Sequence, residues 1–153
     1  MKPEELALGD WVNVKTIDKD TRKEVIKAGR VVELSPYYKR IGVALTKEDA
    51  LRWFGIGFPP SSIEPIPLTA EILEKNGFKR EEEERGFSEP YCVYVNDDFQ
   101  YVIKVYPKDG MDRYSRLEIG EYDDNEYMSL LINHAHELQH ALRLAGVNKE
   151  ITI

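Results

Sequence analysis

The first part of the chain alternates short runs of apolar and β-branched residues with turn-forming residues. Apolar and polar positions alternate from Trp11 onward, as on a strand with one buried face. Asp18-Lys19-Asp20 and Ser35-Pro36 predict turns, and Ala28-Gly29 predicts a break between two strands. Short strands at this spacing, too few for a sandwich, predict a small antiparallel barrel. The predicted strands cover residues 11–14, 24–27, 30–34 and 41–45.

The opening segment, residues 6–12, reads LALGDWV. It resembles the first strand of SH3-like barrels, in which a Gly-Asp turn leads the chain into the sheet. This resemblance implies an SH3-like fold for the N-terminal part and carries no function with it.

A domain boundary is predicted near residue 67, where a proline-rich connector leads into a short helix. Thr69 has the position and chemistry of an N-cap, and Gly77 has those of the left-handed residue that ends a helix. The sequence therefore predicts two domains, residues 1–67 and residues 68–153.

The second domain is predicted to continue as an antiparallel meander and to end in a helix. Aromatic and β-branched runs at residues 91–95 and 99–106 flank a polar turn, which is typical of a hairpin, and residues 114–119 predict a further strand. Residues 126–132 fit either a last strand or the start of the final helix. The fold class predicted for the whole chain is α+β: an SH3-like antiparallel β-barrel, then an antiparallel β-meander with two helices.

The final helix carries the one motif with possible chemistry, His136-Glu137-Leu138-Gln139-His140, which has the H-E-x-x-H form of zinc metalloproteases. At about 100° per residue, His136 and His140 lie about 140° and 180° from the apolar stripe, so both are expected to project outward. The helix is expected to end at Gly146. The stripe comprises Leu131, Ala135, Leu138, Leu142 and Ala145.

A catalytic zinc needs a third protein ligand, and the metzincin pattern has Gly and His where this chain has Arg143 and Gly146. The motif therefore favours surface or interface histidines, with no catalytic residue, metal or cofactor expected. The alternative is a zinc-dependent hydrolase in which His136 and His140 bind the metal and Glu137 is the base.

Three aromatic residues, Trp53, Phe54 and Phe58, lie among glycines and prolines, where neither a regular helix nor a central strand forms. Two interpretations stay open for this loop. Its aromatics either plug one end of the barrel or form an exposed platform for a peptide or ligand. The second interpretation makes these three residues a candidate binding surface.

Composition narrows the classes of protein further. The chain has 42% hydrophobic residues and a single cysteine, Cys92, and contains neither an apolar run long enough to cross a membrane nor a signal-peptide pattern. A cytoplasmic protein without membrane association is therefore expected. Residues 1–67 carry 11 Lys and Arg against 10 Asp and Glu, whereas residues 68–153 carry 10 against 18. This acidic second half argues against a nucleic-acid partner.

The segment Pro65-Ile66-Pro67-Leu68-Thr69-Ala70-Glu71-Ile72-Leu73, with Gly77-Phe78 after it, resembles one found in small uncharacterised proteins of Bacteroides-type bacteria and their phages or mobile elements. The C-terminal letters His136-x-Leu138-Gln139, with Gly146, resemble the end of the same proteins. In that group an Asn commonly stands at the position of His140, which argues against a zinc ligand there. The resemblance implies a phage or mobile-element origin and brings no activity with it.

Together these observations predict a non-enzymatic protein-interaction or adaptor protein with a protein partner. His136 and Gln139, as polar residues of the final helix, join the aromatic loop as candidate binding residues. The sequence identifies neither the partner, nor the biological process, nor the oligomeric state.

Overall fold

The computed structural model divides into two compact units, Met1–Ile66 and Pro67–Ile153. This division lies one residue before the boundary that the proline-rich connector predicts. The structure describes residues 1, 3–18, 20–35, 37–46, 56–81, 84–85, 90–96, 101–105, 115–119 and 128–153.

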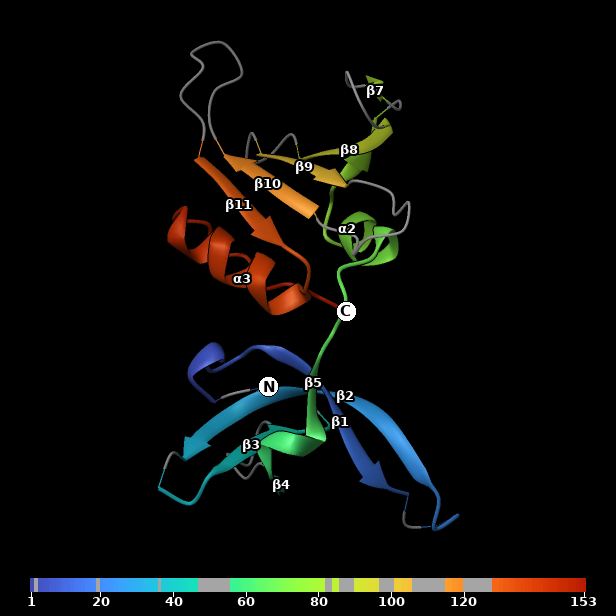
Figure 1. Ribbon diagram of the computed structural model, residues 1–153, viewed down its shortest axis with the longest axis vertical. Helices are drawn as coiled ribbons and strands as arrows, with labels where there is room; N and C mark the ends of the chain where they lie inside the picture. Colours follow the sequence, from blue (N-terminus) through green and yellow to red (C-terminus); the bar gives the residue numbers. More distant parts are fainter. Residues whose placement is uncertain are drawn as a thin grey trace. The chain divides into compact units, whose positions relative to one another are not determined.

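Unit 1, residues 1–66, is built on a five-stranded antiparallel sheet in the order β4-β3-β2-β1-β5 (Figure 1). The first four strands form a meander, and β5 returns to pair with the other side of β1. In the described part of the chain β4 and β5 do not pair with each other, so the sheet is not a closed barrel. The elements are η1 (Pro3–Glu5), β1 (Trp11–Ile17), β2 (Glu24–Ser35), β3 (Arg40–Ala44), β4 (Ile56–Phe58), η2 (Pro60–Ser62) and β5 (Ile63–Pro65).

One face of this sheet supplies the core of unit 1. Along β1 the predicted alternation is present, because Val12 and Val14 are fully buried while their neighbours are not. Burying such side chains contributes about 1.5–3 kcal/mol each relative to leaving them exposed. The core consists of Leu6, Val12, Val14, Val31, Ile41, Val43, Phe58 and Ile63.

Strand β2 runs without interruption through Ala28-Gly29, where the sequence predicted a break, so that prediction was wrong. Gly29 is buried and pairs with Val12 of β1. A Cβ atom at this position would lie 2.6 Å from Val43 Cγ1 and 2.8 Å from the carbonyl oxygen of Ala44. Gly29 therefore allows the backbone of β2 to lie close to Val43 and Ala44, and it does not end the strand.

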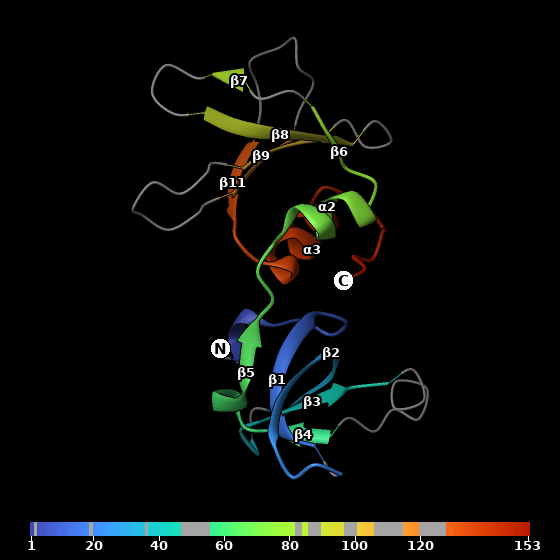
Figure 2. The same cartoon turned by 90° about the vertical axis from the view of Figure 1, so that its right-hand side faces the viewer.

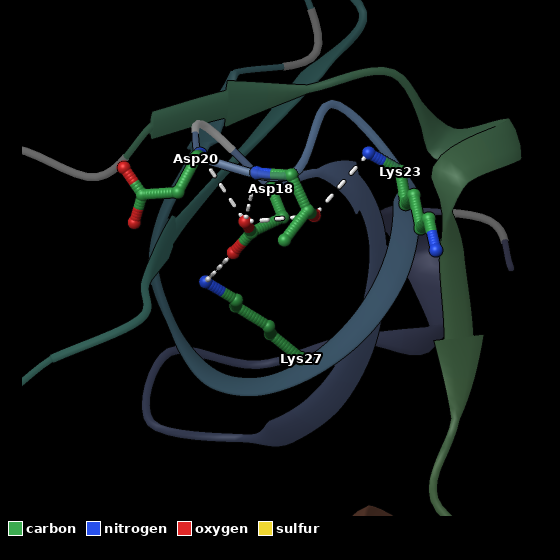
Figure 3. Close-up of polar contacts among 5 residues, drawn as sticks. Asp18, Asp20, Lys23 and Lys27 are labelled. Atoms are coloured by element: carbon green, nitrogen blue, oxygen red, sulfur yellow. Dashed lines mark hydrogen bonds and ion pairs between the residues drawn. The ribbon is translucent and has the colours of Figure 1, made fainter.

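The turn between β1 and β2 is closed by the carboxylate of Asp18 (Figure 3). Its Oδ1 accepts hydrogen bonds from the backbone N–H of Thr21 at 2.9 Å, from the Thr21 hydroxyl at 3.0 Å and from the backbone N–H of Asp20 at 3.2 Å. Its Oδ2 lies 3.7 Å from Nζ of Lys27. The hydrogen bonds from Thr21 lower the pKa of Asp18. This turn is the one predicted at residues 18–20, formed as Asp side chains form turns, by bonding nearby backbone.

Unit 2, residues 67–153, combines an antiparallel sheet in the order β11-β10-β9-β8-β6 with two helices (Figure 2). A further short strand, β7, pairs with β8. The elements are α2 (Ala70–Lys75), β6 (Lys79–Arg80), β7 (Glu84–Arg85), β8 (Pro90–Asn96), β9 (Tyr101–Val105), β10 (Ser115–Ile119), β11 (Met128–Ile132) and α3 (Ala135–Leu144).

The predicted cap at the start of α2 and the predicted glycine after each helix are both present. The hydroxyl of Thr69 caps α2 by accepting a hydrogen bond from the backbone N–H of Ile72 at 3.3 Å. Gly77 and Gly146 follow the two helices with φ angles of +87° and +80°, in the left-handed region that only glycine adopts without strain.

The ambiguous segment before α3 is a strand over Met128–Ile132, and residues 126–127 lie outside the described part of the chain. Leu131 therefore belongs to β11 and is 64% exposed, whereas the adjacent Ile132 is buried. Including Leu131 in the helical stripe was wrong, because residues on a strand alternate between its two faces.

The structure confirms the α+β class, with mostly antiparallel strands and two α-helices among the described residues. None of the helices in the described ranges has the length and apolar character needed to cross a membrane.

Gly29→Ala is expected to destabilise the protein by about 1–3 kcal/mol, because the added methyl group meets rigid backbone and a core side chain. Chemical denaturation followed by tryptophan fluorescence measures the loss. Gly57→Ala is the matched control, since there the nearest atom is Cδ of the flexible Arg40, at 3.3 Å from the added Cβ. Equal losses in the two variants would contradict the close approach at Gly29.

Candidate functional site

Helix α3, which carries the H-E-x-x-H motif, begins directly after β11 and is held there by the connector. The carbonyl of Asn133 accepts a hydrogen bond of 2.8 Å from the backbone N–H of Leu68. His134 forms an isolated β-bridge with Pro67. The first turn of α3 is thus fixed both by the strand before it and by the segment that enters α2.

Glu137 turns back toward the start of its own helix. Its Oε2 accepts hydrogen bonds from the backbone N–H groups of Asn133 at 2.6 Å and His134 at 3.1 Å. Its Oε1 lies 3.2 Å from Nδ1 of His134. This is the N3 carboxylate of a capping box. Burial alone raises the pKa of Glu137, but the hydrogen bonds from Asn133 and His134 outweigh it and leave the pKa lowered.

The three histidines gather beside this cap. The rings of His134 and His136 are stacked with centroids 5.6 Å apart, and those of His136 and His140 meet edge to face at 5.8 Å. His136 is only 5% exposed and His140 is half-buried. The prediction that both imidazoles project outward is therefore wrong for His136.

The reason for this burial is the width of the buried face of α3. At about 100° per residue the buried positions cover more than half of the helix circumference, not one stripe. The most exposed large side chain on α3 is Leu144, at 80%. The buried positions are Ala135, His136, Leu138, Gln139, Ala141 and Leu142.

The side chains of His136, Glu137 and His140 do not fit the zinc site of the alternative hypothesis. Both oxygens of Glu137 are engaged by the helix start, whereas a zinc-bound water needs a base that faces it. In the described ranges, no group of three or more His, Cys, Asp or Glu side chains has an arrangement that would hold a metal ion. His136 and His140 alone do not supply the three protein ligands that a catalytic zinc requires.

Gln139, a predicted binding residue, is 4% exposed and bonds the last residues of the same chain. Its Nε2 donates a hydrogen bond of 2.9 Å to the carbonyl of Lys149, and its Oε1 accepts one from the backbone N–H of Ile151. Its amide therefore binds backbone at its donor end and at its acceptor end, and it does not form part of an exposed surface.

Asn76, the C-cap residue of α2, makes a similar pair of contacts and was missed by the sequence analysis. Its Nδ2 donates to the carbonyl of Thr152 at 2.7 Å, and its Oδ1 accepts from the backbone N–H of the same residue at 2.9 Å. Asn76 is 3% exposed. The only local signal was its place before Gly77, which indicates a helix end and not a long-range contact.

The predicted aromatic surface lies only partly within the described residues. Trp53 and Phe54 are outside them. Phe58 lies on β4, is 8% exposed and belongs to the core of unit 1, so it does not form a binding surface. On the same strand Ile56 is 50% exposed.

The outer face of the unit 1 sheet carries a pocket of about 560 Å³, which we name the β2–β4 pocket. Gly42 of β3 pairs with Glu33 of β2 on one side and with Gly57 of β4 on the other. Two glycines side by side leave this part of the sheet without side chains. The pocket is lined by Glu33, Ser35, Tyr38, Arg40, Gly42 and Gly57.

Charged and aromatic groups surround the glycine floor. A Cβ on Gly57 would lie 3.3 Å from Cδ of Arg40, and one on Gly42 would lie 3.4 Å from Oε2 of Glu33, so both side chains stand over the glycines. Tyr38 is 72% exposed and packs edge to face against Tyr37, with centroids 5.0 Å apart. The Tyr-Tyr pair after a turn was a signal for this surface that the sequence analysis did not use.

Comparison with protein-family models, with curated proteins and with solved structures finds no match to this chain. The assignment of a function therefore depends on the geometry of these residues.

Glu137→Ala is expected to destabilise the protein by about 1 kcal/mol, because the backbone N–H groups at the start of α3 lose their acceptor. The lowered pKa of Glu137 means that its ionised form stabilises the folded state. This contribution is present above the ordinary glutamate pKa near 4.5 and is lost as the pH falls through the lowered value.

Urea denaturation at pH 7 and at successively lower pH measures the difference between Glu137→Ala and the wild type. The matched control is Glu81→Ala, which removes an exposed carboxylate from the same unit. A difference that stays constant down to the lowest pH would contradict the assigned role of Glu137.

Proposed function

We propose that the protein is a non-enzymatic protein-interaction module whose N-terminal unit is SH3-like and binds a peptide segment of a partner at the β2–β4 pocket. The observation that carries the proposal is the pocket, in which an exposed tyrosine and charges of both signs surround a floor of backbone. Its volume of about 560 Å³ is within the range of ligand sites.

The strand order supports the SH3-like part of the proposal. A four-stranded meander whose first strand is joined on its other side by the last strand brings the two ends of unit 1 together in one sheet. This arrangement agrees with the fold that the LALGDWV opening resembles.

The chemistry of the pocket suits a peptide with polar groups of both signs. The guanidinium of Arg40 presents several N–H donors in a planar fork that matches a carboxylate. The Glu33 carboxylate accepts hydrogen bonds from N–H groups, and the exposed ring of Tyr38 offers a flat surface for an apolar side chain.

The near-neutral charge of unit 1 and the acidic character of unit 2 favour a protein partner over a nucleic acid. A cytoplasmic location and a phage or mobile-element origin remain predictions from the sequence. The contacts that engage both oxygens of Glu137 at the start of α3 disfavour the zinc-dependent hydrolase.

Panning a random peptide library against the full-length protein tests the pocket. Binding of the enriched peptides to Arg40→Ala and Tyr38→Ala is expected to weaken by roughly tenfold or more, because a charge-assisted hydrogen bond or a stacked ring is lost. Isothermal titration calorimetry measures the affinities.

The matched controls are Ile26→Ala and Lys23→Ala, which remove an exposed apolar side chain and an exposed charge that do not line the pocket. Unchanged binding in these two variants locates the peptide in the pocket. Enriched peptides that bind Arg40→Ala and Tyr38→Ala as well as the wild type would overturn the proposal.

Metal analysis separates the proposed function from the hydrolase. Protein purified without chelator is expected to contain far less than one zinc per chain by inductively coupled plasma mass spectrometry. His140→Ala is expected to leave that content unchanged, because Glu137 serves the helix start and no third ligand joins the two histidines in the described residues. Stoichiometric zinc that is lost in His140→Ala would establish the alternative.

A further inference from the structure

Residues 147–153, which we name the tail, follow α3 and belong to neither a helix nor a strand. The tail leaves α3 at Gly146 and returns to α2, where Nζ of Lys75 donates a hydrogen bond of 2.7 Å to the carbonyl of Ile153 (Figure 2). Within the tail Ile151 is 1% exposed, whereas Glu150 and Thr152 on either side are exposed.

Two buried amide side chains hold the tail by its backbone. Gln139 contacts the carbonyl of Lys149 and the N–H of Ile151, and Asn76 contacts both the N–H and the carbonyl of Thr152. Each amide thus donates one hydrogen bond to the main chain of the tail and accepts one from it, as a neighbouring β-strand would. We name these two residues the amide clamp.

Recognition of this kind depends little on the sequence of the segment that is held. Every peptide offers the same N–H and C=O groups to the amide clamp, except where proline removes an N–H. Ile151 has the most deeply buried side chain of the tail, at 1% exposed, and Val147 beside α3 is 9% exposed. Main-chain hydrogen bonds combined with a pocket for one side chain are also how proteins bind added peptide strands.

The connection between α3 and the tail turns at Gly146, where the backbone N–H groups of Gly146 and Val147 donate to carbonyls of α3. Gly146 has a φ of +80°, and a Cβ placed on it would meet no atom within 4 Å. The tail has no ladder partner in a sheet among the described residues, so its release breaks side-chain contacts and no strand pairing. Strand pairing therefore does not oppose the release of the tail, whereas the burial of Ile151 does.

We propose that the amide clamp and the enclosure around Ile151 form a second peptide-binding site, which the tail occupies in cis. The site accepts in trans a partner segment with an aliphatic side chain between polar neighbours, which is the chemistry of the tail itself. The site lies in unit 2 and does not depend on the β2–β4 pocket. The site in unit 2 becomes accessible when a partner segment displaces the tail.

Fluorescence polarisation of a labelled peptide with the tail sequence VNKEITI tests this site on the full-length chain. In the wild type the attached tail competes at a high effective concentration, so binding is expected to be weak. In Ile151→Asp the attached tail loses its enclosed side chain, and the peptide is expected to bind at least tenfold more tightly.

Two matched controls locate the bound peptide. Adding Gln139→Leu to Ile151→Asp is expected to weaken binding at least tenfold, because the leucine keeps the volume and removes both amide contacts. A labelled peptide with Asp in place of its isoleucine is expected not to bind. Ile151→Asp that is folded by circular dichroism and binds no peptide would overturn the proposal.

Hydrogen exchange on the wild type provides a second measurement if Ile151→Asp does not fold. The amides of Ile151 and Thr152 are expected to exchange through an opening at least tenfold more frequent than the opening that exposes Leu142. Exchange of all three at one common rate would mean that the tail leaves only on unfolding, and would overturn the proposal.

Sedimentation velocity adds the remaining outcome: a dimer that disappears in Ile151→Asp would assign the site to a second copy of the chain and overturn the choice of a partner.

Discussion

The fold of unit 2 depends on the rule that buried backbone groups need hydrogen-bond partners. The tail contacts α2 and α3 and pairs with none of the described strands, and side chains of the two helices bind its N–H and C=O groups. Asn76 and Gln139 do this from inside the protein, each nearly fully buried. Leaving one buried polar group unsatisfied costs about 1–3 kcal/mol, which is a large share of the stability of a small domain. The two amides are therefore part of the fold as much as of any site.

The same rule explains the place of Glu137 within the H-E-x-x-H letters. A helix start exposes several N–H groups that have no partner within the helix. Glu137 satisfies those of Asn133 and His134, and its lowered pKa records that the ionised form is the one they stabilise. A carboxylate engaged in this way does not face a water on a metal. The second letter of the motif is thus a capping-box glutamate.

Features encoded by neighbouring residues were predicted well from the sequence. The alternation from Trp11, the cap at Thr69 and the helix ends at Gly77 and Gly146 all depend on residues within a few positions of one another. Features that depend on distant partners were not predicted. Gly29 looked like a strand break because the crowding around it comes from β3.

The errors in the site have the same origin. His136 was placed on the outer face because one apolar stripe was taken as the whole buried face of α3, and because Leu131 was counted on the helix when it belongs to β11. Asn76 could not be connected with Thr152, since 76 positions separate them and amides carry no periodic signal. A polar residue in a buried position is informative only once its partner is known.

The two proposed sites would obtain affinity from different physical sources. In the β2–β4 pocket the groups are exposed, so their charges are screened by salt and favour the choice of ligand more than the strength of binding. In the amide clamp the groups are already removed from water by the tail, so an incoming segment replaces one set of hydrogen bonds by an equal set. The buried aliphatic side chain is exchanged in the same way, so the net free energy comes from how well the new side chain fits and from the entropy of the released tail. Exchange at the amide clamp is therefore controlled by how well the tail competes, and binding at the pocket by which charges the partner presents.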